Sequence, residues 1–479
     1  MRWEPVIGLE IHAELKTRTK MFCDSLNDPN ESRPNTNVCP ICMAHPGSLP
    51  TINRQAVEKV IQVGLALSGS ITPFTFFERK NYFYPDLPKG YQISQYARPL
   101  VENASLDISR PDGAVERIRV RRIHLEEDTG RSIHDSKTKT TLVDFNRAGI
   151  PLMELVTEPD LHNPTDARLA AESLQRIFQY VGASDANMDK GEMRIEANVS
   201  VRPAGSSELG TKVELKNINS FRFVDDAIRT EIARQTTLLE RGEKVIQETR
   251  GWDAAAGTTV SQRLKEESQD YRYFPEPDLP PLEIGPETIE TLRQSLPELP
   301  AVKLERFRNE YGIDAKIAAT LVRDRRFAAF FEATASELHN QSLQLAANYL
   351  TTDIVKLLAA KEIAITEAPL TPENFAELIT YIASNRISSR SAKETLAAMI
   401  SSSIDPSVYI DEHGLWQESA DTGLNEAAAH VIAANKKAAD DFRKGKKEAL
   451  QFLTGQVMKE ARGADPKKVR ALLEEQLRD

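Results

Sequence analysis

The sequence predicts an α+β fold in roughly the first 300 residues and a mainly helical remainder. Of the 26 prolines, 22 lie at or before Pro300, and so do 16 of the 22 glycines, which indicates strands, turns and loops in this part of the chain. Segments with strand periodicity and segments with helical spacing are mixed there without strict alternation. An antiparallel or mixed sheet is therefore expected rather than a doubly wound one.

The expected elements follow from the spacing of apolar residues. Strand-like alternation with a period of two occurs at residues 6–15, 118–128, 194–201 and 212–217. Helical spacing occurs at 53–67, 165–181 and 223–239, and beyond Pro300 at 314–331 and 371–384. For the helix at 165–181 we expect Thr165 to act as the N-cap after Pro164, and Gly182 to end the helix.

Two breaks divide the chain into three predicted domains. A proline-rich stretch at 274–281 and the Pro297–Pro300 segment close the first part, and a polar break at 401–406 divides the rest. We therefore predict domains at residues 1–294, 295–405 and 406–479.

The composition excludes several classes of protein. A hydrophobic share of 40% with 28% charged residues rules out a collagen-like or wholly disordered chain. Three cysteines, Cys23, Cys39 and Cys42, argue against a disulfide-stapled secreted protein and for a reducing compartment. The N-terminus lacks a secretory core, and the apolar run at 60–77 is broken by glycine and proline. We expect a cytoplasmic protein with no membrane span.

Acids and histidines on the predicted strands are the most informative feature. A period of two places alternate residues on one face of a strand, and an exposed face of this kind is common on any single strand. Four strands that combine carboxylates with His, Arg or Lys are harder to explain in that way. The four sets are Glu10, His12 and Glu14; His124, Glu126 and Asp128; Arg194, Glu196 and Asn198; and Lys212, Glu214 and Lys216.

These sets are suited to a divalent metal ion and a phosphoryl group. Carboxylates that converge with an imidazole suit Mg²⁺ or Mn²⁺, and the interleaved Arg and Lys would neutralise phosphoryl oxygens. The sequence contains no Walker-type loop and no kinase-like glycine-rich loop. Any nucleotide is therefore expected to bind in another arrangement.

The cysteines form a second candidate metal site. Cys39 and Cys42 make a Cys-x2-Cys knuckle, and Cys23 precedes them at a spacing compatible with zinc. With only three thiols, His45 or a water would have to complete the set. Reduced cysteines that bind no metal are an equally good interpretation.

Two further segments have both a simple and a functional interpretation. Residues 79–91 are dense in aromatics, which favours core aromatics on a strand over a pocket wall that stacks on a base or ribose of RNA.

The net charge of −10 does not favour non-specific nucleic-acid binding, but residues 436–470 carry eleven basic and five acidic residues. That stretch is either a solvated helix face or an RNA contact.

Several of these segments, in this order, resemble the signatures of one family. They are VIGLEIH at 6–12, RKNYFYPDLPKGYQISQ at 79–95, IHLEED at 123–128, GTKVELKN at 210–217, QETR at 247–250, DYRYFPEPDLPPL at 270–282 and FLTGQVMKEARGADPKKV at 452–469. Together they resemble the GatB/GatE family, the B subunits of aspartyl/glutamyl-tRNA(Asn/Gln) amidotransferases, over the full length of the chain.

The resemblance implies an ATP- and Mg²⁺-dependent carbon–nitrogen ligase that acts on tRNA. The side-chain carboxylate of misacylated Asp-tRNA(Asn) or Glu-tRNA(Gln) would be converted to an acyl phosphate, from which ammonia displaces phosphate. The implied partners are an amidase subunit that releases ammonia from glutamine, a small third subunit, the tRNA itself and, as a further candidate, a non-discriminating aminoacyl-tRNA synthetase. The implied domains are a cradle-like catalytic domain, a helical domain and a tRNA-binding tail.

Residue roles come from the same resemblance. It implies a metal and acyl-phosphate site at Glu10, His12, Glu126 and Glu214, with Arg194 as a further catalytic group and with Glu127 and Asp128 as second-rank metal ligands. Substrate or ATP contacts are implied at Lys80, Tyr82, Lys89, Glu196 and Lys216. Contacts to tRNA are implied at Lys446, Lys447, Lys467 and Lys468. In family members with zinc, a Cys-x-Cys pairs with the Cys-x2-Cys, whereas here Ser25 stands where the second thiol would be. The resemblance therefore leaves zinc at Cys23, Cys39 and Cys42 open.

Two other functions stay open on the sequence. A non-catalytic adaptor that presents tRNA to an enzyme would need the basic tail but not the His/Glu strands. A free-standing ligase would use ammonia directly with a free acid. Nothing in the sequence decides between Asn-tRNA and Gln-tRNA as the product.

Overall fold

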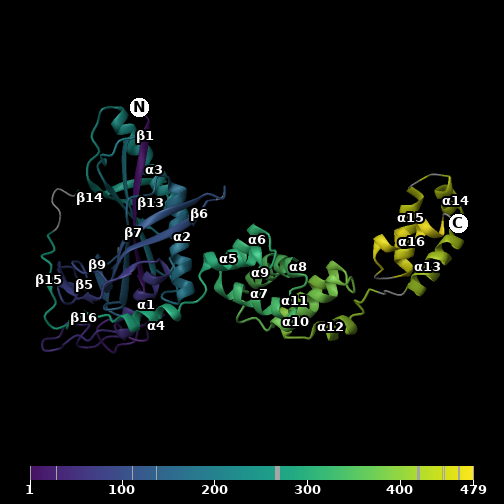
Figure 1. Cartoon of the computed structure of the whole chain (residues 1–479), viewed down its shortest axis with the longest axis horizontal. Coiled ribbons are helices and arrows are strands. Elements are labelled where there is room, and N and C mark those ends of the chain that lie inside the picture. The colour runs from purple at the N-terminus through teal and green to yellow at the C-terminus, as the bar shows by residue number, and fades with distance from the viewer. Residues whose placement is uncertain are drawn as a thin grey trace. The chain divides into compact units, whose positions relative to one another are not determined.

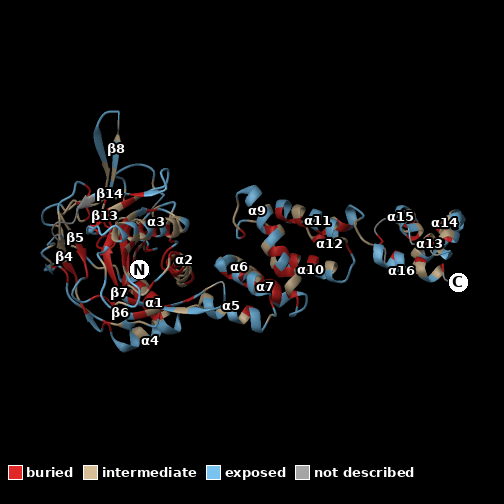
Figure 2. Cartoon of the chain, turned by 90° about the horizontal axis from the view of Figure 1, so that it is seen from above, coloured by how far each residue is buried: buried red, intermediate tan, exposed pale blue. Residues whose placement is uncertain are grey.

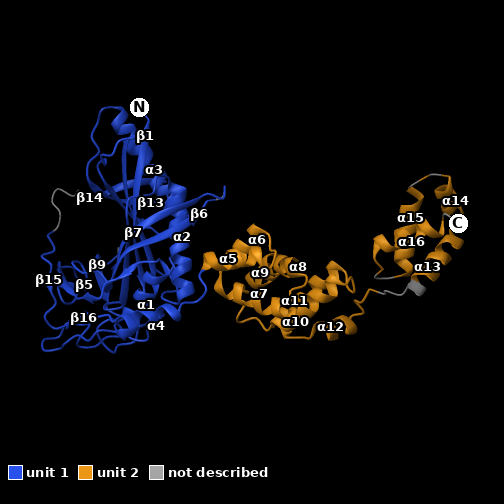
Figure 3. Ribbon diagram, viewed as in Figure 1, with its two compact units in different colours: residues 1–299 blue, residues 300–479 orange. Residues whose placement is uncertain are grey.

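The computed structural model describes residues 2–28, 30–110, 112–135, 137–264, 270–417, 421–444, 446, 448–461 and 464–477. The chain divides into two compact units, residues 1–299 and 300–479 (Figure 3). The first unit is built on β-sheet and the second on helices (Figure 1). The α+β prediction with a helical C-terminal part is confirmed.

A nine-stranded sheet organises the described part of the first unit. Neighbouring strands are antiparallel except for β12 and β13, which are parallel, so the prediction of a mainly antiparallel, mixed sheet is confirmed. In spatial order the strands are β14 (Thr258–Leu264), β13 (Glu248–Asp253), β12 (Val213–Ile218), β11 (Met193–Pro203), β1 (Trp3–Glu14), β10 (Pro151–Thr157), β7 (Val115–Glu127), β6 (Val101–Ser109) and β2 (Ser70–Ile71).

Smaller sheets complete the unit. β4 (Glu78–Asn81) lies between β5 (Tyr91–Ser94) and β15 (Phe274–Pro275), which joins the 79–95 segment to the 270–282 segment. β3 (Phe74–Thr75) pairs with β16 (Leu282–Glu283), and β8 (Arg131–Asp135) pairs with β9 (Thr140–Asp144) in a two-stranded ribbon.

Three helices cover one face of the large sheet (Figure 1). They are α1 (Arg54–Ala66), α2 (Pro164–Val181) and α3 (Phe221–Glu240). In β1, Leu9, Ile11 and Ala13 belong to the core formed with these helices and are at most 1% exposed. Figure 2 shows buried residues along the strands of the sheet. Because side chains alternate along a strand, Glu10 and His12 lie on the opposite face of the sheet.

Three sequence-based expectations need correction. Asn163, not Thr165, is the N-cap of α2: Asn163 has extended backbone and its side chain accepts a hydrogen bond from the Asp166 N–H at 2.8 Å. The helix expected at 314–331 is two helices, because Asp324 has extended backbone and caps the second. The alternation at 118–128 is interrupted by a β-bulge at Arg121. Gly182 ends α2 in the left-handed conformation, as predicted.

The last helix of the first unit is α4 (Pro286–Gln294), which packs on α1.

In the second unit, α13 to α16 share a core that includes Val431, Leu453, Val457 and Val469. Our boundary after residue 405 falls between α11 and α12 and stays a prediction. The elements are α5 (Pro300–Asn309), α6 (Ala315–Arg323), α7 (Arg325–Glu337), α8 (Leu343–Tyr349), a π-helical turn (Leu350–Ile354), α9 (Val355–Lys361), α10 (Pro372–Ala383), α11 (Ser389–Ser402), α12 (Pro406–Glu412), α13 (Asp421–Ala434), α14 (Lys436–Arg443), α15 (Glu448–Glu460) and α16 (Pro466–Gln476).

None of the helices in the described ranges combines the length and the apolar character that a membrane crossing requires.

Candidate active site

Four side chains that are far apart in the sequence form one row across the polar face of the sheet. His12 in β1 faces Arg194 in β11 on one side and Glu154 in β10 on the other, and Glu154 in turn faces His124 in β7. The four strands predicted to carry functional residues therefore belong to one sheet. β10, which the sequence analysis did not single out, lies between β1 and β7.

Carboxylates surround His12. Its Nε2 lies 3.3 Å from Glu154 Oε2, 3.5 Å from Glu126 Oε1 and 3.9 Å from Glu10 Oε1. His124 Nε2 approaches the same Glu154 oxygen to 3.4 Å. These five residues form what we call the carboxylate–imidazole cluster, and the structure brings the predicted residues Glu10, His12 and Glu126 together in it.

The donor atoms of the cluster fit a hard divalent cation. Glu10, His12 and Glu154 form one group, and His124, Glu126 and Glu154 form another; within each group the ligand atoms lie within 4.8 Å of one another. An octahedral Mg²⁺ with bonds of about 2.1 Å would place opposite ligands about 4.2 Å apart. In the described part of the chain His124 Nδ1 is buried without a hydrogen-bond partner.

The crowding of like charges perturbs the titration of the cluster. Burial and the neighbouring Glu154 carboxylate raise the pKa of Glu10 to about 7. Burial acts to lower the pKa of His12, but the carboxylates of Glu154, Glu126 and Glu10 outweigh it and raise this pKa to about 9. The pKa of Glu154 is well below its ordinary value, because His124 and His12 overcome its burial. A cation at this position would relieve the repulsion.

Glu154 is the functional candidate that sequence reasoning missed. It is 6% exposed and belongs to both groups of potential ligands. The signal in the sequence is a single acid in an otherwise apolar strand, PLMELVT, since an unpaired buried carboxylate is costly and is rarely retained without a partner.

A second charged group lies beside the cluster. Lys216 Nζ is 2.8 Å from both oxygens of Glu196, which is the Cα partner of Glu10. Glu214 Oε1 is 3.6 Å from Lys216 Nζ, and Glu214 Oε2 accepts a hydrogen bond from Thr249 at 2.7 Å. Among the described residues Glu214 is outside both groups of potential metal ligands, and its role as a ligand stays a prediction.

A third group of charged residues lies where β1 and β7 end and β11 begins. Arg194 Nη2 is 2.8 Å from Asp128 Oδ2, and Arg147 Nε is 3.7 Å from the same oxygen. These cations hold the pKa of Asp128 below its ordinary value despite its burial. Burial and the Asp128 charge raise the pKa of Glu14 to about 8. Arg194 is thus held beside the cluster by Asp128.

Aromatic side chains border the cluster on one side. Lys80 Nζ lies 5.3 Å from the centre of the Tyr271 ring, and Tyr82 meets the same ring edge-on. Burial acts to lower the pKa of Lys80, but Glu126, Tyr273 and Glu154 raise it. Burial raises the pKa of Tyr82.

The preferred interpretation of residues 79–91 as core aromatics is wrong for Phe83 and Tyr84, which are 84% and 60% exposed. They lie in the turn between β4 and β5, outside both strands.

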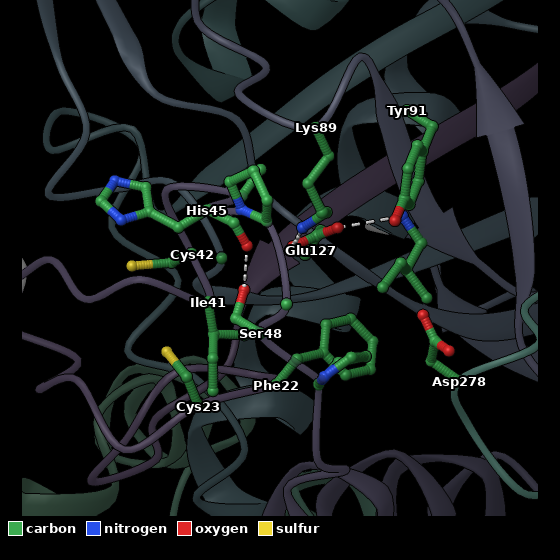
Figure 4. Close-up of a pocket in the computed structure, with 16 residues that line it drawn as sticks. Phe22, Cys23, Ile41, Cys42, His45, Ser48, Lys89, Tyr91, Glu127 and Asp278 are labelled. Carbon is green, nitrogen blue, oxygen red and sulfur yellow. Dashed lines mark hydrogen bonds and ion pairs between the residues drawn. The ribbon is translucent and has the colours of Figure 1, made fainter.

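Glu127 points away from the cluster. Its carboxylate accepts hydrogen bonds from Lys89 Nζ at 2.6 Å and from the Ile93 N–H at 3.0 Å. Glu127 and Lys89 line a cavity of about 260 Å³ together with Cys23 and Cys42 (Figure 4). The reason is the period of two, which directs Glu127 to the face opposite Glu126.

The three cysteines lie together, with their sulfur atoms within 4.8 Å of one another. Cys42 Sγ is 3.8 Å from the Cys39 sulfur, 3.9 Å from the Ser25 hydroxyl and 3.8 Å from Lys20 Nζ. The Cys23 thiol and the Lys20 ammonium lower the pKa of Cys42 to about 4. The three sulfurs could hold a metal ion and supply three of the four ligands of a closed tetrahedral zinc site. Zinc at this position stays a prediction.

The tail lysines belong to the second unit. Lys446 Nζ is 3.1 Å from Asp441 Oδ1, whereas Lys467 and Lys468 are exposed in the first turn of α16. Lys447 lies outside the described residues.

The sequence matches two family models and many known proteins. Residues 5–290 match the GatB/GatE catalytic domain, and residues 329–477 match the GatB domain. The chain is 46% identical over 479 residues to the B subunit of the aspartyl/glutamyl-tRNA(Asn/Gln) amidotransferase of Carboxydothermus hydrogenoformans, covering 99% of each chain. It is 46% identical over 480 residues to the B subunit of the same enzyme from Thermomicrobium roseum, and 45% identical over 478 residues to that from Halorhodospira halophila. Each of these two comparisons covers 100% of this chain and 99% of the relative.

Proposed function

Since the chain belongs to the GatB/GatE family, the B subunits of tRNA-dependent amidotransferases, we propose that its first unit activates the side-chain carboxylate of a misacylated tRNA. ATP phosphorylates the aspartyl or glutamyl side chain of Asp-tRNA(Asn) or Glu-tRNA(Gln). Ammonia then replaces phosphate, giving Asn-tRNA(Asn) or Gln-tRNA(Gln). Phosphorylation is needed because a carboxylate oxygen is a poor leaving group.

The observation that carries this proposal is the carboxylate–imidazole cluster. Three carboxylates and two imidazoles from three adjacent strands converge on the polar face of the sheet. Glu10, His12, Glu126 and Glu154 would hold Mg²⁺, with His124 as a further ligand. A bound Mg²⁺ would neutralise charge on the transferring phosphoryl group.

The other side chains of the site have roles that follow from their charge and position. His12 must give up the proton that the surrounding carboxylates now favour before it can act as a ligand. Lys80 and Arg194 lie near the cluster carboxylates and would keep their charge, since nearby carboxylates raise the pKa of each. Both are suited to bind oxygens of ATP or of the acyl phosphate. The Lys216–Glu196 pair would keep Glu10 in position.

The proposal includes partners, because this chain has no evident amidase nucleophile motif. A separate amidase subunit would supply ammonia from glutamine, a small third subunit would join the two, and the reaction would take place in the cytoplasm. The second unit would bind the tRNA through the exposed Lys467 and Lys468.

The adaptor alternative is not favoured. An adaptor requires neither a catalytic-domain sequence over residues 5–290 nor a buried cluster of potential ligands, and maintaining such a cluster costs stability.

The experiment is reconstitution of the chain with the two proposed partner subunits. We expect ATP-dependent amidation of Asp-tRNA(Asn), Glu-tRNA(Gln) or both, and ADP formation that depends on the aminoacyl-tRNA. The variants Glu10→Ala and His12→Ala should abolish ADP formation while tRNA affinity stays within several-fold of wild type. Full amidation by either variant would overturn the assignment of the cluster, and activity with free aspartate plus ammonium would support a free-standing ligase instead.

A further inference from the structure

A β-bulge brings Arg122 to the polar face of the sheet. Val156 in β10 faces Arg122 in β7, but the next residue, Thr157, faces Val120, so Arg121 is an extra residue. Side-chain alternation changes phase at such a bulge. Val120, on the N-terminal side of the bulge, is buried in the core. Arg122, on the C-terminal side, lies on the polar face of the sheet with His124 and Glu126.

The guanidinium of Arg122 lies at the edge of the carboxylate–imidazole cluster. Its Nη2 is 3.8 Å from Glu154 Oε1, a distance too long for a hydrogen bond. Its Cζ lies 5.3 Å from the centre of the Tyr96 ring, and Tyr96 stacks on Tyr273 at 4.4 Å with an interplanar angle of 14°. The paired rings limit the orientations that the guanidinium can adopt.

Arg122 differs from the other arginines of its strand. Arg117, Arg119 and Arg121 each bind a carboxylate through two nitrogens, at distances of 2.6–2.9 Å, with Asp107, Asp160 and Glu158 as the partners. In the described part of the chain, Arg122 Nε is buried and has no hydrogen-bond partner. A buried donor without an acceptor is uncommon, because it has lost its water without compensation.

We propose that Arg122 binds oxygens of the phosphoryl group that passes from ATP to the substrate carboxylate. This inference rests on the proposed function. A guanidinium presents parallel N–H donors that match two phosphate oxygens, and a phosphoryl group beside the metal ligands would satisfy the unpaired Nε–H. In the transfer, the bond from phosphorus to the ADP oxygen breaks and a bond to the carboxylate oxygen forms. Arg122 keeps its proton throughout and only neutralises charge.

The test compares Arg122→Gln and Arg122→Lys with Arg117→Gln in the reconstituted complex. Arg117 is a matched control, since it lies in the same strand and its partner Asp107 is on the surface. The measured quantities are kcat and KM for ATP in aminoacyl-tRNA-dependent ADP formation, and the Mn²⁺ affinity of each variant. We expect Arg122→Gln to lose on the order of 10²-fold in kcat/KM for ATP. Arg122→Lys should recover part of this loss, and Arg117→Gln should stay within about twofold of wild type.

The outcomes separate this inference from the proposed function. Equal kcat/KM for Arg122→Gln and Arg117→Gln would overturn the inference alone. A loss of Mn²⁺ affinity with unchanged kcat at saturating metal would also overturn it, because Arg122 would then only position Glu154. A wild-type complex that forms no ADP would overturn the proposed function itself. Retention of the wild-type unfolding temperature by both Arg122→Gln and Arg122→Lys excludes misfolding as the cause of a loss.

Discussion

His12 Nε2 lies 3.3 Å from Glu154 Oε2, and the Cα atoms of these residues are partners in the antiparallel pair β1–β10. The contact joins a residue near the start of the chain to one in a strand that carries no other acid. Glu154 also approaches His124 from the other side, so one carboxylate links the two halves of the cluster.

The first prediction concerns Glu154. Glu154→Gln keeps the size of the side chain but removes the charge, so a bound cation would lose a ligand shared by both groups. We expect a loss of at least about 100-fold in the rate of ADP formation, with tRNA affinity within several-fold of wild type. The control is Glu158→Gln just beyond the same strand, where Glu158 pairs with Arg121. Equal rates for the two variants would contradict the assignment.

The second prediction concerns protons released on metal binding. At pH 7 His12, with a pKa of about 9, is protonated, and Glu10, with a pKa of about 7, is half protonated. Both must be deprotonated to bind a cation, so we expect about one to one and a half protons released per Mn²⁺. Calorimetry in two buffers of different ionisation enthalpy measures this number. Apparent affinity should rise with pH between 7 and 9, and a pH-independent affinity would exclude His12 as a ligand.

The third prediction concerns the stability of the metal-free protein. The folded pKa of His12, about 9, is above its ordinary value of about 6.5, so protonated His12 stabilises the fold below pH 6.5 and this stabilisation is lost as pH rises through 9. A shift of about 2.5 units corresponds to roughly 3 kcal/mol. The unfolding free energy of wild type relative to His12→Gln, measured with urea and a chelator, should therefore fall between pH 6 and pH 9.5. A constant difference would contradict this account.

The fourth prediction concerns the cysteines. The Ser25 hydroxyl lies 3.9 Å from Cys42 Sγ, so Ser25→Cys would supply a fourth thiol to the three already present. Because structural zinc sites are closed by four ligands, we expect this variant to bind one zinc per chain with far higher affinity than wild type. Metal analysis of protein purified without chelator gives the answer. Ser32→Cys, at an exposed site of the same loop, is the control, and equal zinc content in the two variants would contradict the prediction.

The fifth prediction concerns the tail. Lys467 and Lys468 are exposed, whereas Lys446 pairs with Asp441. If the first two contact phosphates, replacing both by Gln should lower the slope of log affinity for tRNA against log salt by about 1.4 to 1.8. Replacing Lys446 by Gln should change it less, because its charge is already compensated. Filter binding over a range of salt concentrations measures the slopes, and an unchanged slope in the double variant would show that these lysines form a solvated face.

The sequence by itself determined which face of β1 is polar. A period of two is a local property of the backbone, so the alternation in β1 was enough to separate Glu10 and His12 from Leu9 and Ile11. The same property separates Glu126 from Glu127, although the sequence analysis grouped both as metal ligands. The family and the α+β class were likewise evident from local patterns and motifs.

Only the tertiary structure decided which strands are neighbours. The order of strands in a sheet depends on pairing between remote segments, and nothing local indicates that β10 separates β1 from β7. Glu154 therefore entered the cluster only with the fold. The bulge at Arg121 could likewise be recognised only in the folded structure. Arg121 is an extra residue only relative to β10, in which it has no pairing residue. The sequence therefore determines which side chains each strand can contribute to the site, whereas the tertiary structure determines which strands bring them together.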